Sequence, residues 1–532
     1  MKRGEIARHV SRGAFFLALE KVAALVSGML YFALMLRWLG PTNYGILTLA
    51  LAVTGFASVL TGNFEVFLER YAAEYQARRR YDLLFRAHGI AVGLKVVLGL
   101  VASGVVIAAI PVLVHQFEVP ALAVLLPILV FTVASDGLYT TGRSLLFGLQ
   151  RFEWVSGLSL LFHISKTVLV GMLWWAQQGL VAMAVGLAVL TVAQALLFSL
   201  VALLLAHQTS LEPATSEPAP PGPDDDRPLW RQMMGYCLPL LGARAAFLSG
   251  QNLGKLLLAK VLDPTQLGYF TFAFQTIERF VELVYALPSA LLPSLTHLVA
   301  RAERERLGYI FDQAFRLVQV AACVVAWCVF AFSPELTLWV GSPLFLPSLA
   351  MLQVLALVPI ARTAQQPLTM LFQATRRPGL VLTLAMVKLG VEMTCYVVIV
   401  PRLGGLGAAY ANLAGAVVSY LAALAFSATL LPETAWSRAG TLARALLLTV
   451  PMLLIAAFIM YEWPSGVGSL LARVALVVPA TVSLFALGLL TRYDLEKLSA
   501  LDLRSNILRR IRDAVVAAID PLARVFEPRR PA

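Results

Sequence analysis

The sequence predicts an all-α polytopic membrane protein with about 14 transmembrane helices, arranged as two six-helix pseudo-symmetric lobes plus two extra C-terminal helices. Of its 532 residues, 59% are hydrophobic and only 14% are charged, whereas a soluble domain is roughly 45–50% apolar and about 25% charged. The apolar residues also form continuous runs, without the period-two alternation of β-barrel strands. These observations exclude a soluble enzyme, a disordered protein and a disulfide scaffold.

A membrane-spanning helix needs about 20 mostly apolar residues. The runs that meet this length are residues 13–37, 44–66, 88–112, 121–147, 155–176, 180–206, 232–260, 267–298, 312–333, 347–372, 380–400, 406–431, 442–461 and 468–491. The first run is too long for the apolar part of a signal peptide, and no small-residue cleavage site follows it, so we expect it to be retained. Prolines inside the runs predict kinks, and Pro288 and Pro293 in the eighth run are the expected hinges.

The positions of the basic residues predict the orientation. The chain carries 42 Lys and Arg against 30 Asp and Glu, for a net charge of +12. When the loops between the predicted spans are assigned alternately to the two sides, most of these bases fall on the side of both termini. The other side carries only Arg37, Arg402 and Arg473. Because Lys and Arg concentrate in cytoplasmic loops, we expect both termini to be cytoplasmic.

An internal repeat relates the two halves of the chain. Residues Leu39–Ala50 align without gaps to Leu262–Ala273, and six of the twelve positions are identical at an offset of 223. Each segment is the predicted turn between the first two helices of its half. An offset of six helices is typical of transporters whose two parallel repeats are related by an axis along the membrane normal.

The repeat and the composition divide the chain into five parts. The N-terminal lobe is expected over residues 1–206, the C-terminal lobe over 230–431, and helices 13 and 14 over 432–491. Residues 207–229 are rich in Pro and acid, which predicts an unstructured cytoplasmic linker. Residues 492–532 combine apolar residues at helical spacing with several Arg, which predicts an amphipathic tail on anionic lipid. The alternative for this tail is a solvated helix that packs on the rest of the protein.

Bases inside the predicted spans are the main functional signal. A Lys or Arg at the bilayer centre costs about 2.5–3.5 kcal/mol, so each must face a wet cavity, pair with an acid or reach the interface. Lys21 and Arg244 are related by the repeat offset of 223. The predicted cationic cavity is lined by Lys21, Arg244, Lys255, Arg279, Lys166, Lys95, Arg362 and Lys388, with Gln251 and Asn252 as polar neighbours on the seventh helix.

Structural alternatives exist for these bases. Lys388 and Glu392 are four residues apart on one helix, and Arg279 and Glu282 are three apart, so each couple can form an internal ion pair. The other bases can pair with an acid from another helix. Among the acids, Asp136, Glu65 and Glu392 are candidates for coupling transport to H⁺ or Na⁺, and each can equally bind a Lys of another helix.

Several catalytic classes lack their motifs. The sequence contains no G-x-x-x-x-G-K-[ST] and no H-E-x-x-H, and its six His are scattered, so we expect neither direct use of ATP nor a metal site. No cofactor and no nucleic-acid partner are expected. A membrane polymerase or glycosyltransferase needs a sizeable loop outside the membrane, but the longest predicted outer loop, residues 334–346, has the length of a connector. We therefore expect a protein that is not an enzyme.

Four segments carry a family resemblance: Arg37–Leu47, Arg70–Tyr75, Ser144–Phe152 and Gly404–Asn412. They resemble the bacterial polysaccharide transporters, the flippases of lipid-linked oligosaccharides such as O-antigen units. The resemblance covers most of residues 10–430. The wider superfamily includes the lipid II flippase and the multidrug and toxin extruders, and twelve helices would favour the extruders.

The resemblance implies a fold of two six-helix lobes in a V shape and a mechanism of alternating access in the bacterial inner membrane. It also implies a cation-lined cavity for an undecaprenyl-pyrophosphate head group, with the lipid tail left in the bilayer. Polysaccharide polymerase or assembly proteins are possible partners. Lys21 and the bases of the seventh and eighth helices fall on helices that carry cavity charges in such flippases, although no motif fixes them one by one. An ion-coupled extruder of small molecules and a lipid II flippase stay open as alternatives.

Overall fold

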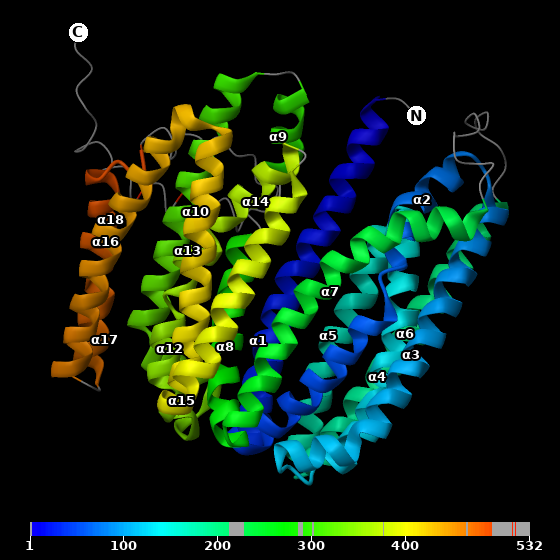
Figure 1. The fold of residues 1–532 in the computed structure, drawn as a ribbon, viewed down its shortest axis with the longest axis horizontal. Helices are drawn as coiled ribbons and strands as arrows, with labels where there is room; N and C mark the ends of the chain where they lie inside the picture. The colour runs from blue at the N-terminus through cyan, green and yellow to red at the C-terminus, as the bar shows by residue number, and fades with distance from the viewer. Residues whose placement is uncertain are drawn as a thin grey trace. The chain divides into compact units, whose positions relative to one another are not determined.

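The computed structural model describes residues 3–211, 228–285, 291–300, 303–375, 377–463, 466–491, 513 and 517. Within these ranges the chain forms helices joined by short connections and contains no strand, which confirms the all-α prediction (Figure 1). Ten of the described helices are long and apolar enough to cross a membrane. The protein is therefore a multi-pass membrane protein, and the count of fourteen spans stays a prediction.

The chain packs as two compact units. Unit 1 comprises Met1–Phe272, Leu338–Pro347 and Tyr396–Gly405. Its elements are α1 (Arg3–Ala57), η1 (Ser58–Thr61), α2 (Glu65–Ala77), α3 (Tyr81–Phe117), α4 (Leu122–Gly148), α5 (Phe152–Trp175), α6 (Leu180–Leu211), α7 (Leu229–Val261), the first residues of α8 (Pro264–Tyr285), most of η3 (Thr337–Gly341) and most of η4 (Pro343–Ser348).

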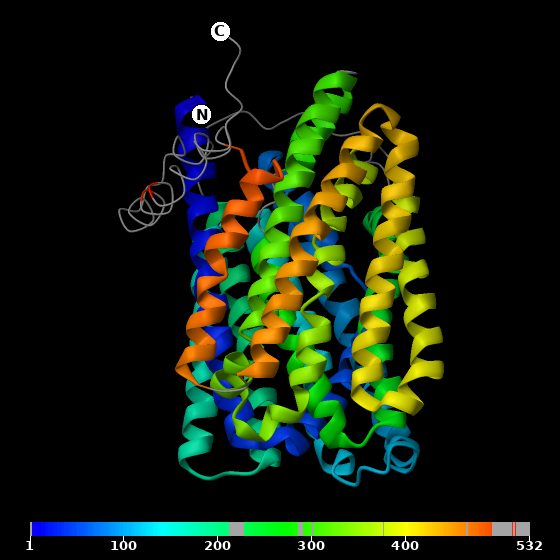
Figure 2. The same cartoon turned by 90° about the vertical axis from the view of Figure 1, so that its left-hand side faces the viewer.

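Unit 2 comprises Ala273–Thr337, Ser348–Cys395 and Leu406–Ala532. Besides most of α8, its elements are α9 (Leu291–Ala300), α10 (Arg304–Ala331), α11 (Ser333–Leu336), α12 (Leu349–Leu355), α13 (Val358–Arg362), α14 (Gln365–Ala374), the two arms of α15 (Pro378–Leu430), η5 (Pro432–Thr434), α16 (Ala435–Glu462), α17 (Val467–Ala475) and α18 (Val477–Ala486). Helix α16, drawn in orange, packs along α10 (Figure 2).

Glycines divide the two longest helices. α1 contains a non-helical residue at Gly40, just before Pro41, and α15 contains one at Gly404. Both residues have positive φ angles, 67° and 58°, which glycine adopts without the steric cost that a Cβ imposes. Each helix therefore accounts for two of the predicted spans.

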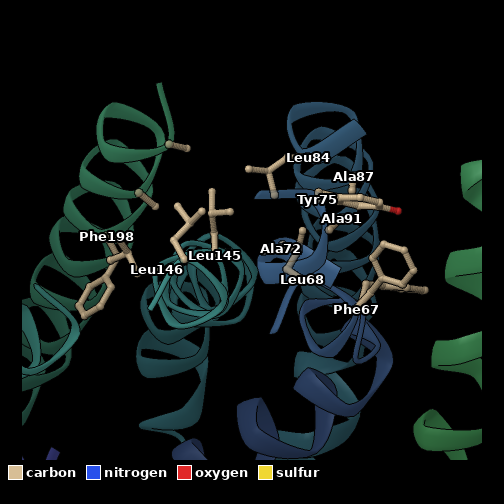
Figure 3. Close-up of a cluster of buried hydrophobic side chains, with 14 of the residues drawn as sticks. Phe67, Leu68, Ala72, Tyr75, Leu84, Ala87, Ala91, Leu145, Leu146 and Phe198 are labelled. Carbon is tan, nitrogen blue, oxygen red and sulfur yellow. The ribbon is translucent and has the colours of Figure 1, made fainter. Parts of the chain in front are cut away.

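The core of unit 1 forms where α2 meets its neighbours. Phe67, Leu68 and Ala72 of α2 pack with Leu145 of α4 in a cluster to which α3, α5, α6 and α7 also contribute (Figure 3). Most of these side chains are inaccessible to solvent. This packing holds α2 rigidly, which matters because α2 carries one of the charged residues described below.

The two repeats touch each other at equivalent residues within unit 1. The hydroxyl oxygens of Thr42 and Thr265, which are 223 residues apart, lie 2.9 Å from each other. Each threonine follows the proline of its turn, between the first two helices of its repeat. The alignment found in the sequence therefore corresponds to a direct contact between the two turns.

Two glycines make this contact possible. A Cβ on Gly45 would lie 1.8 Å from the carbonyl oxygen of Pro264, and a Cβ on Gly268 would lie 2.1 Å from the carbonyl oxygen of Pro41. The two approaches are reciprocal, because each glycine and each proline has its partner at the same offset of 223. Only glycine fits at either position without moving the backbone. We call this set of contacts the repeat junction.

The predicted linker and tail fall largely outside the described residues. Helix α6 continues to Leu211 and α7 begins at Leu229, so the undescribed segment lies within the predicted linker, residues 207–229. The contacts place α7 in unit 1. The expected lobe boundaries, 1–206 and 230–431, stay predictions.

Candidate functional site: charged clusters at two broken helices

Unit 1 contains a helix that is interrupted within the predicted second span. α1 gives way to η1, after which Gly62 adopts a positive φ of 81° and α2 begins at Glu65. Thr61 at the end of η1 donates its hydroxyl hydrogen bond back to the carbonyl of Ser58, at 2.8 Å. Interrupted helices in membrane transporters commonly mark binding sites, because non-helical backbone within the bilayer must be enclosed by protein or line a wet cavity.

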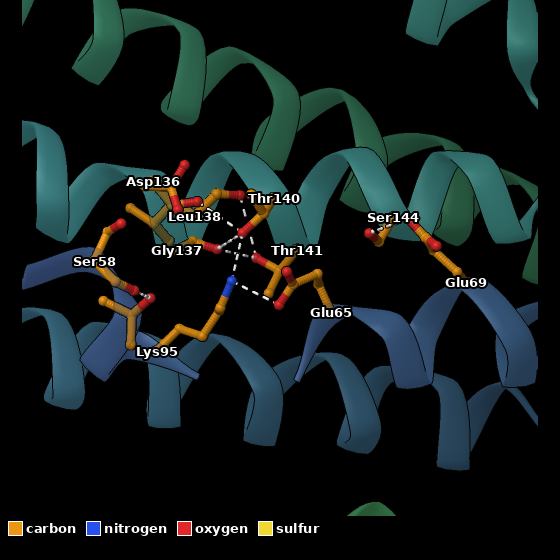
Figure 4. Close-up of polar contacts among 11 residues, drawn as sticks. Ser58, Glu65, Glu69, Lys95, Asp136, Gly137, Leu138, Thr140, Thr141 and Ser144 are labelled. Atoms are coloured by element: carbon orange, nitrogen blue, oxygen red, sulfur yellow. Dashed lines mark hydrogen bonds and ion pairs between the residues drawn. The ribbon is translucent and has the colours of Figure 1, made fainter. Parts of the chain in front are cut away.

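A buried ion pair lies directly after this break. The ammonium nitrogen of Lys95, on α3, is 2.6 Å from Oε2 of Glu65, and the two side chains are 0% and 5% exposed. Lys95 also donates a hydrogen bond of 2.7 Å to the hydroxyl of Thr140 on α4, and that hydroxyl donates to the carbonyl of Asp136 at 2.7 Å. Figure 4 shows the ammonium between the carboxylate and the hydroxyl. We call Glu65, Lys95 and Thr140 the unit 1 charged cluster.

A glycine on α4 allows this geometry. A Cβ on Gly137 would lie 2.9 Å from Cβ of Lys95, so α3 and α4 approach closely at this point. The short distance between the helices brings the long side chain of Lys95 alongside Thr140, one turn further along α4. Asp136 is half-buried beside Gly137, and Figure 4 shows it on the same stretch of α4 as Thr140.

Two of the sequence candidates thus meet each other. Lys95 was a predicted cavity cation and Glu65 a predicted ion-coupling acid, and in the structure they form one pair. Removing one partner of a buried pair typically costs about 3–5 kcal/mol, because the other charge is left without compensation. Loss of either partner would therefore destabilise unit 1, and the intact pair has no net charge.

Unit 2 has a charged cluster at an equally fragmented helix. The predicted tenth span consists of three short helices, α12, α13 and α14, and Pro359 occupies the first turn of α13. Arg362, the last residue of α13, forms two hydrogen bonds to Glu278 of α8, one of them 3.0 Å long from Nη2 to Oε2. Both side chains are 17% exposed. A further sequence candidate is thus neutralised by an acid from another helix of its own unit.

The ion pair that the sequence allowed on the first arm of α15 is present. Lys388 lies 3.3 Å from Oε1 of Glu392, which also accepts a hydrogen bond of 3.2 Å from Asn412 on the other arm. A Cβ on Gly415 would lie 2.5 Å from Cγ of Glu392, so a glycine again makes room for a buried acid. The predicted coupling acid Glu392 is therefore held by a base and an amide.

The second intrahelical pair is also present but more accessible. Arg279 lies 3.5 Å from Glu282, and their side chains are 32% and 59% exposed. An exposed pair of this kind contributes little to stability, at most about 1 kcal/mol. The charge of Arg279 is thus less constrained than the charge of Lys95.

Helices α1 and α5 share a polar strip within unit 1. Ser27 of α1 donates to the carbonyl of His163 at 2.9 Å, and its hydroxyl lies 2.9 Å from that of Thr167. Lys166 of α5 is half-buried, and its ammonium lies 4.7 Å from the ring centroid of Tyr31 on α1. A cation placed over an aromatic ring in this way is stabilised by roughly 0.5–2 kcal/mol. This strip places a base inside a helix of bilayer length.

Several predicted site residues lie outside the described residues or at their margin. Pro288 is outside the described ranges, and the side chains of Pro293, Lys21, Arg244, Gln251 and Asn252 are likewise outside what the structure describes. Lys255, on the described part of α7, is half-buried. The predicted pairing of Lys21 with Arg244 across the repeat therefore stays a prediction.

Two buried arginines were not predicted from the sequence. Arg438 and Arg473 are each 2% exposed and lie in α16 and α17, although Arg473 was expected in a loop. Arg438 contacts Asp312 at 3.3 Å, and Arg473 contacts Glu335 at 2.6 Å. Their partner acids lie more than a hundred residues away in sequence. The sequence alone could not reveal these ion pairs, because they form only where α16 and α17 pack against other helices of unit 2.

No metal-binding arrangement is present in the described part of the chain: it contains no group of three or more His, Cys, Asp or Glu side chains that could hold an ion. The charged side chains described above instead form ion pairs, in which a base and an acid of the same unit neutralise each other.

Comparison with known proteins relates this architecture to a family and a fold. A family model described as "Polysaccharide biosynthesis protein" matches residues 10–299, and no curated protein matches the chain. The fold is similar to that of an inward-facing multidrug resistance MATE family transporter of the MOP superfamily, with a TM-score of 0.59 at 14% identity over 78% of this chain and 98% of that one.

Two further solved structures are similar. The lipid II flippase MurJ, in an inward closed conformation, has a TM-score of 0.57 at 12% identity and covers 85% of this chain and 98% of its own. An outward-facing conformation of a MATE family transporter has a TM-score of 0.54 at 14% identity, covering 79% and 96%. At these identities the similarity shows a shared fold and nothing further.

Proposed function

The chain belongs to the polysaccharide biosynthesis protein family, and on this premise we propose that it is a flippase that moves an anionic, undecaprenyl-pyrophosphate-linked oligosaccharide from the cytoplasmic to the outer leaflet. The host membrane is the bacterial inner membrane, with both chain termini in the cytoplasm. The chain acts as a transporter and catalyses no sugar transfer. The arguments for the cargo and for the mechanism come from different observations.

The cargo class rests on Lys166. Several bases within the described helices are held by an acid of the same unit, as Lys95 is by Glu65 and Arg362 is by Glu278. The ammonium of Lys166 lies 4.7 Å from the ring centroid of Tyr31, in the polar strip shared by α1 and α5. A pyrophosphate is recognised by several cationic donors at close range. We propose that Lys166 supplies one of them, together with Lys21, Arg244 and Lys255.

The mechanism rests on fold and on the broken helices. The similar MATE transporters are known in inward-facing and outward-facing conformations, and interrupted helices are typical of transporters that work by alternating access. We propose the same mechanism here, with H⁺ or Na⁺ as a possible coupling ion and polysaccharide polymerase or assembly proteins as possible partners.

A vesicle assay tests the cargo. Purified protein is reconstituted with a fluorescent undecaprenyl-pyrophosphate oligosaccharide, and the rate at which the sugar becomes accessible on the other leaflet is measured. Lys166→Gln should lower this rate at least tenfold and Lys166→Arg should retain most of it, because the guanidinium keeps the charge. Lys260→Gln is the matched control, since Lys260 is exposed in the last turn of α7. Full activity in both Lys166→Gln and a Lys21→Glu/Arg244→Glu variant would reject the anionic cargo site.

The same vesicle assay distinguishes the proposed function from the alternatives. An ion-coupled drug exporter would move a cationic dye and ignore the lipid-linked sugar, whereas a lipid II flippase would move lipid II faster than the oligosaccharide carrier. Sugar transfer by the purified protein would point to a polymerase or glycosyltransferase. The proposed function requires transport of the oligosaccharide carrier and an absence of transfer.

A further inference from the structure

The unit 1 charged cluster has the ligands of a cation site, with an ammonium in place of the ion. Around Nζ of Lys95 lie a carboxylate oxygen of Glu65 at 2.6 Å and the hydroxyl oxygen of Thr140 at 2.7 Å. Oxygen atoms of carboxylates and hydroxyls are the donors that hard cations take in proteins. The cluster also adjoins the break at Gly62, and interrupted helices are where transporters hold Na⁺ or H⁺.

The burial of the cluster makes an uncompensated charge on Glu65 costly. Glu65 is 5% exposed and held in place by the packed α2, so its charge needs a partner inside the protein. Lys95 supplies that partner from α3, through a side chain that is fully buried. A bound alkali ion would provide the same single positive charge at the same place.

We propose that the ammonium of Lys95 is a tethered cation that fills a latent alkali-metal site formed by Glu65 and Thr140 next to the break of the second helix. The tether prevents exchange, so this cluster stays neutral without taking up or releasing an ion. Removing the Lys95 side chain exposes the oxygen ligands and converts the cluster into a site for Na⁺ or K⁺. This inference does not depend on the cargo, because it concerns ion binding by unit 1 alone.

The geometry explains why the lysine is well placed for this role. Because Gly137 has no Cβ, α3 can approach α4 closely at Lys95. The ammonium of Lys95 therefore reaches the hydroxyl of Thr140, which lies about one turn further along α4. The Thr140 hydroxyl donates to the carbonyl of Asp136, so its lone pairs are directed to the ammonium. A hydroxyl oriented in this way can accept from an ammonium or ligate a metal ion without reorganising.

Direct binding measurements test the proposal on the purified full-length chain. Equilibrium dialysis with ²²Na⁺ and with ⁸⁶Rb⁺, the latter as a probe for K⁺, is compared between wild type and Lys95→Ala. We expect the variant to bind about one more ion per chain than wild type does. Its thermal unfolding temperature should also rise by roughly 2–5 °C, saturably, when choline is replaced by Na⁺ or K⁺ at constant ionic strength, whereas wild type should not respond.

Three control variants make the outcome specific. Glu65→Gln combined with Lys95→Ala removes the carboxylate and should abolish the extra ion, and Lys95→Met fills the space with an apolar side chain and should gain none. Lys260→Ala removes an exposed lysine and should behave as wild type. Lys95→Ser, whose hydroxyl adds an oxygen ligand, is a second variant that should bind as Lys95→Ala does.

The proposal fails under clear conditions. If neither Lys95→Ala nor Lys95→Ser binds more ²²Na⁺ or ⁸⁶Rb⁺ than wild type, no latent site exists and Glu65 is neutralised by a proton instead. Failure of both variants to fold in Na⁺, K⁺ and choline alike overturns it equally, because a bound ion should replace the missing charge. Loss of oligosaccharide transport has no bearing on either result, so this test and the test of the proposed function are independent.

Discussion

Arg473 is the buried charge whose removal has the most direct structural consequence. Its guanidinium forms hydrogen bonds of 2.9 and 2.6 Å to the two carboxylate oxygens of Glu335. It also donates to the carbonyl of Ala331 at 2.5 Å and to that of Ser469 at 3.2 Å. These bonds join α17 to the segment that follows α10. We predict that Arg473→Met detaches this end of α17 and destabilises unit 2.

The size of the effect follows from burial. Breaking a buried ion pair by removing one partner costs about 3–5 kcal/mol, which is a large part of a typical stability of 5–15 kcal/mol. Arg473 is 2% exposed but Glu335 is 19% exposed, so the abandoned carboxylate can regain some water. We therefore expect the low end, about 3 kcal/mol. Arg473→Lys keeps the positive charge but loses the bidentate contact with the carboxylate. It should therefore lower the free energy of unfolding by about half as much as Arg473→Met does.

Equilibrium unfolding in mixed micelles, followed by circular dichroism, measures these costs. Arg402→Met is the control, because Arg402 is exposed, and it should change the free energy of unfolding by no more than about 0.5 kcal/mol. Replacing both partners, as in Arg473→Met/Glu335→Met, should recover most of the loss, since no unpaired charge remains. The reasoning is refuted if Arg473→Met is as stable as the control or if the double variant is no better than the single one.

Two further predictions concern close approaches between helices. Gly137→Ala should lower the free energy of unfolding by about 1–3 kcal/mol, because its Cβ would lie 2.9 Å from Cβ of Lys95. Gly157→Ala, with nothing within 4 Å, should be neutral or slightly stabilising in the same equilibrium unfolding measurement, and equal effects would contradict the packing argument. At the repeat junction, Thr42→Cys/Thr265→Cys should form a disulfide, because the hydroxyls it replaces are 2.9 Å apart. Oxidation should then lower transport in the vesicle assay at least tenfold and reductant should restore it; transport that continues through the cross-link would show that the junction does not open.

The helices were predictable because their signal is local. Continuous apolar runs identify spans by length alone, and prolines indicate where a span bends. The breaks themselves were not predicted. The expected span 44–66 is interrupted by η1 and Gly62 before α2 begins, and the expected span 347–372 is divided into three helices. Apolar composition is the same on both sides of such a break, so hydrophobicity cannot reveal it.

The charged pairs divide by the distance between their members in sequence. Lys388 and Glu392 are on the same helix face, and periodicity is enough to bring them together. Lys95 and Glu65 are on different helices, so their meeting depends on the rotation of α3 and on a close approach to α4 at Gly137. Those quantities are set by side-chain packing in the core of unit 1, which a single sequence does not display.

Neutralisation within each unit narrows the search for cargo contacts. A base that is paired with an acid in the low-dielectric interior has its attraction largely satisfied, so Lys95, Arg362 and Arg473 contribute little field to a passing anion. Under the proposed function, we therefore expect the charge for a pyrophosphate to come from other bases within the helices, and Lys166 of the polar strip is our candidate.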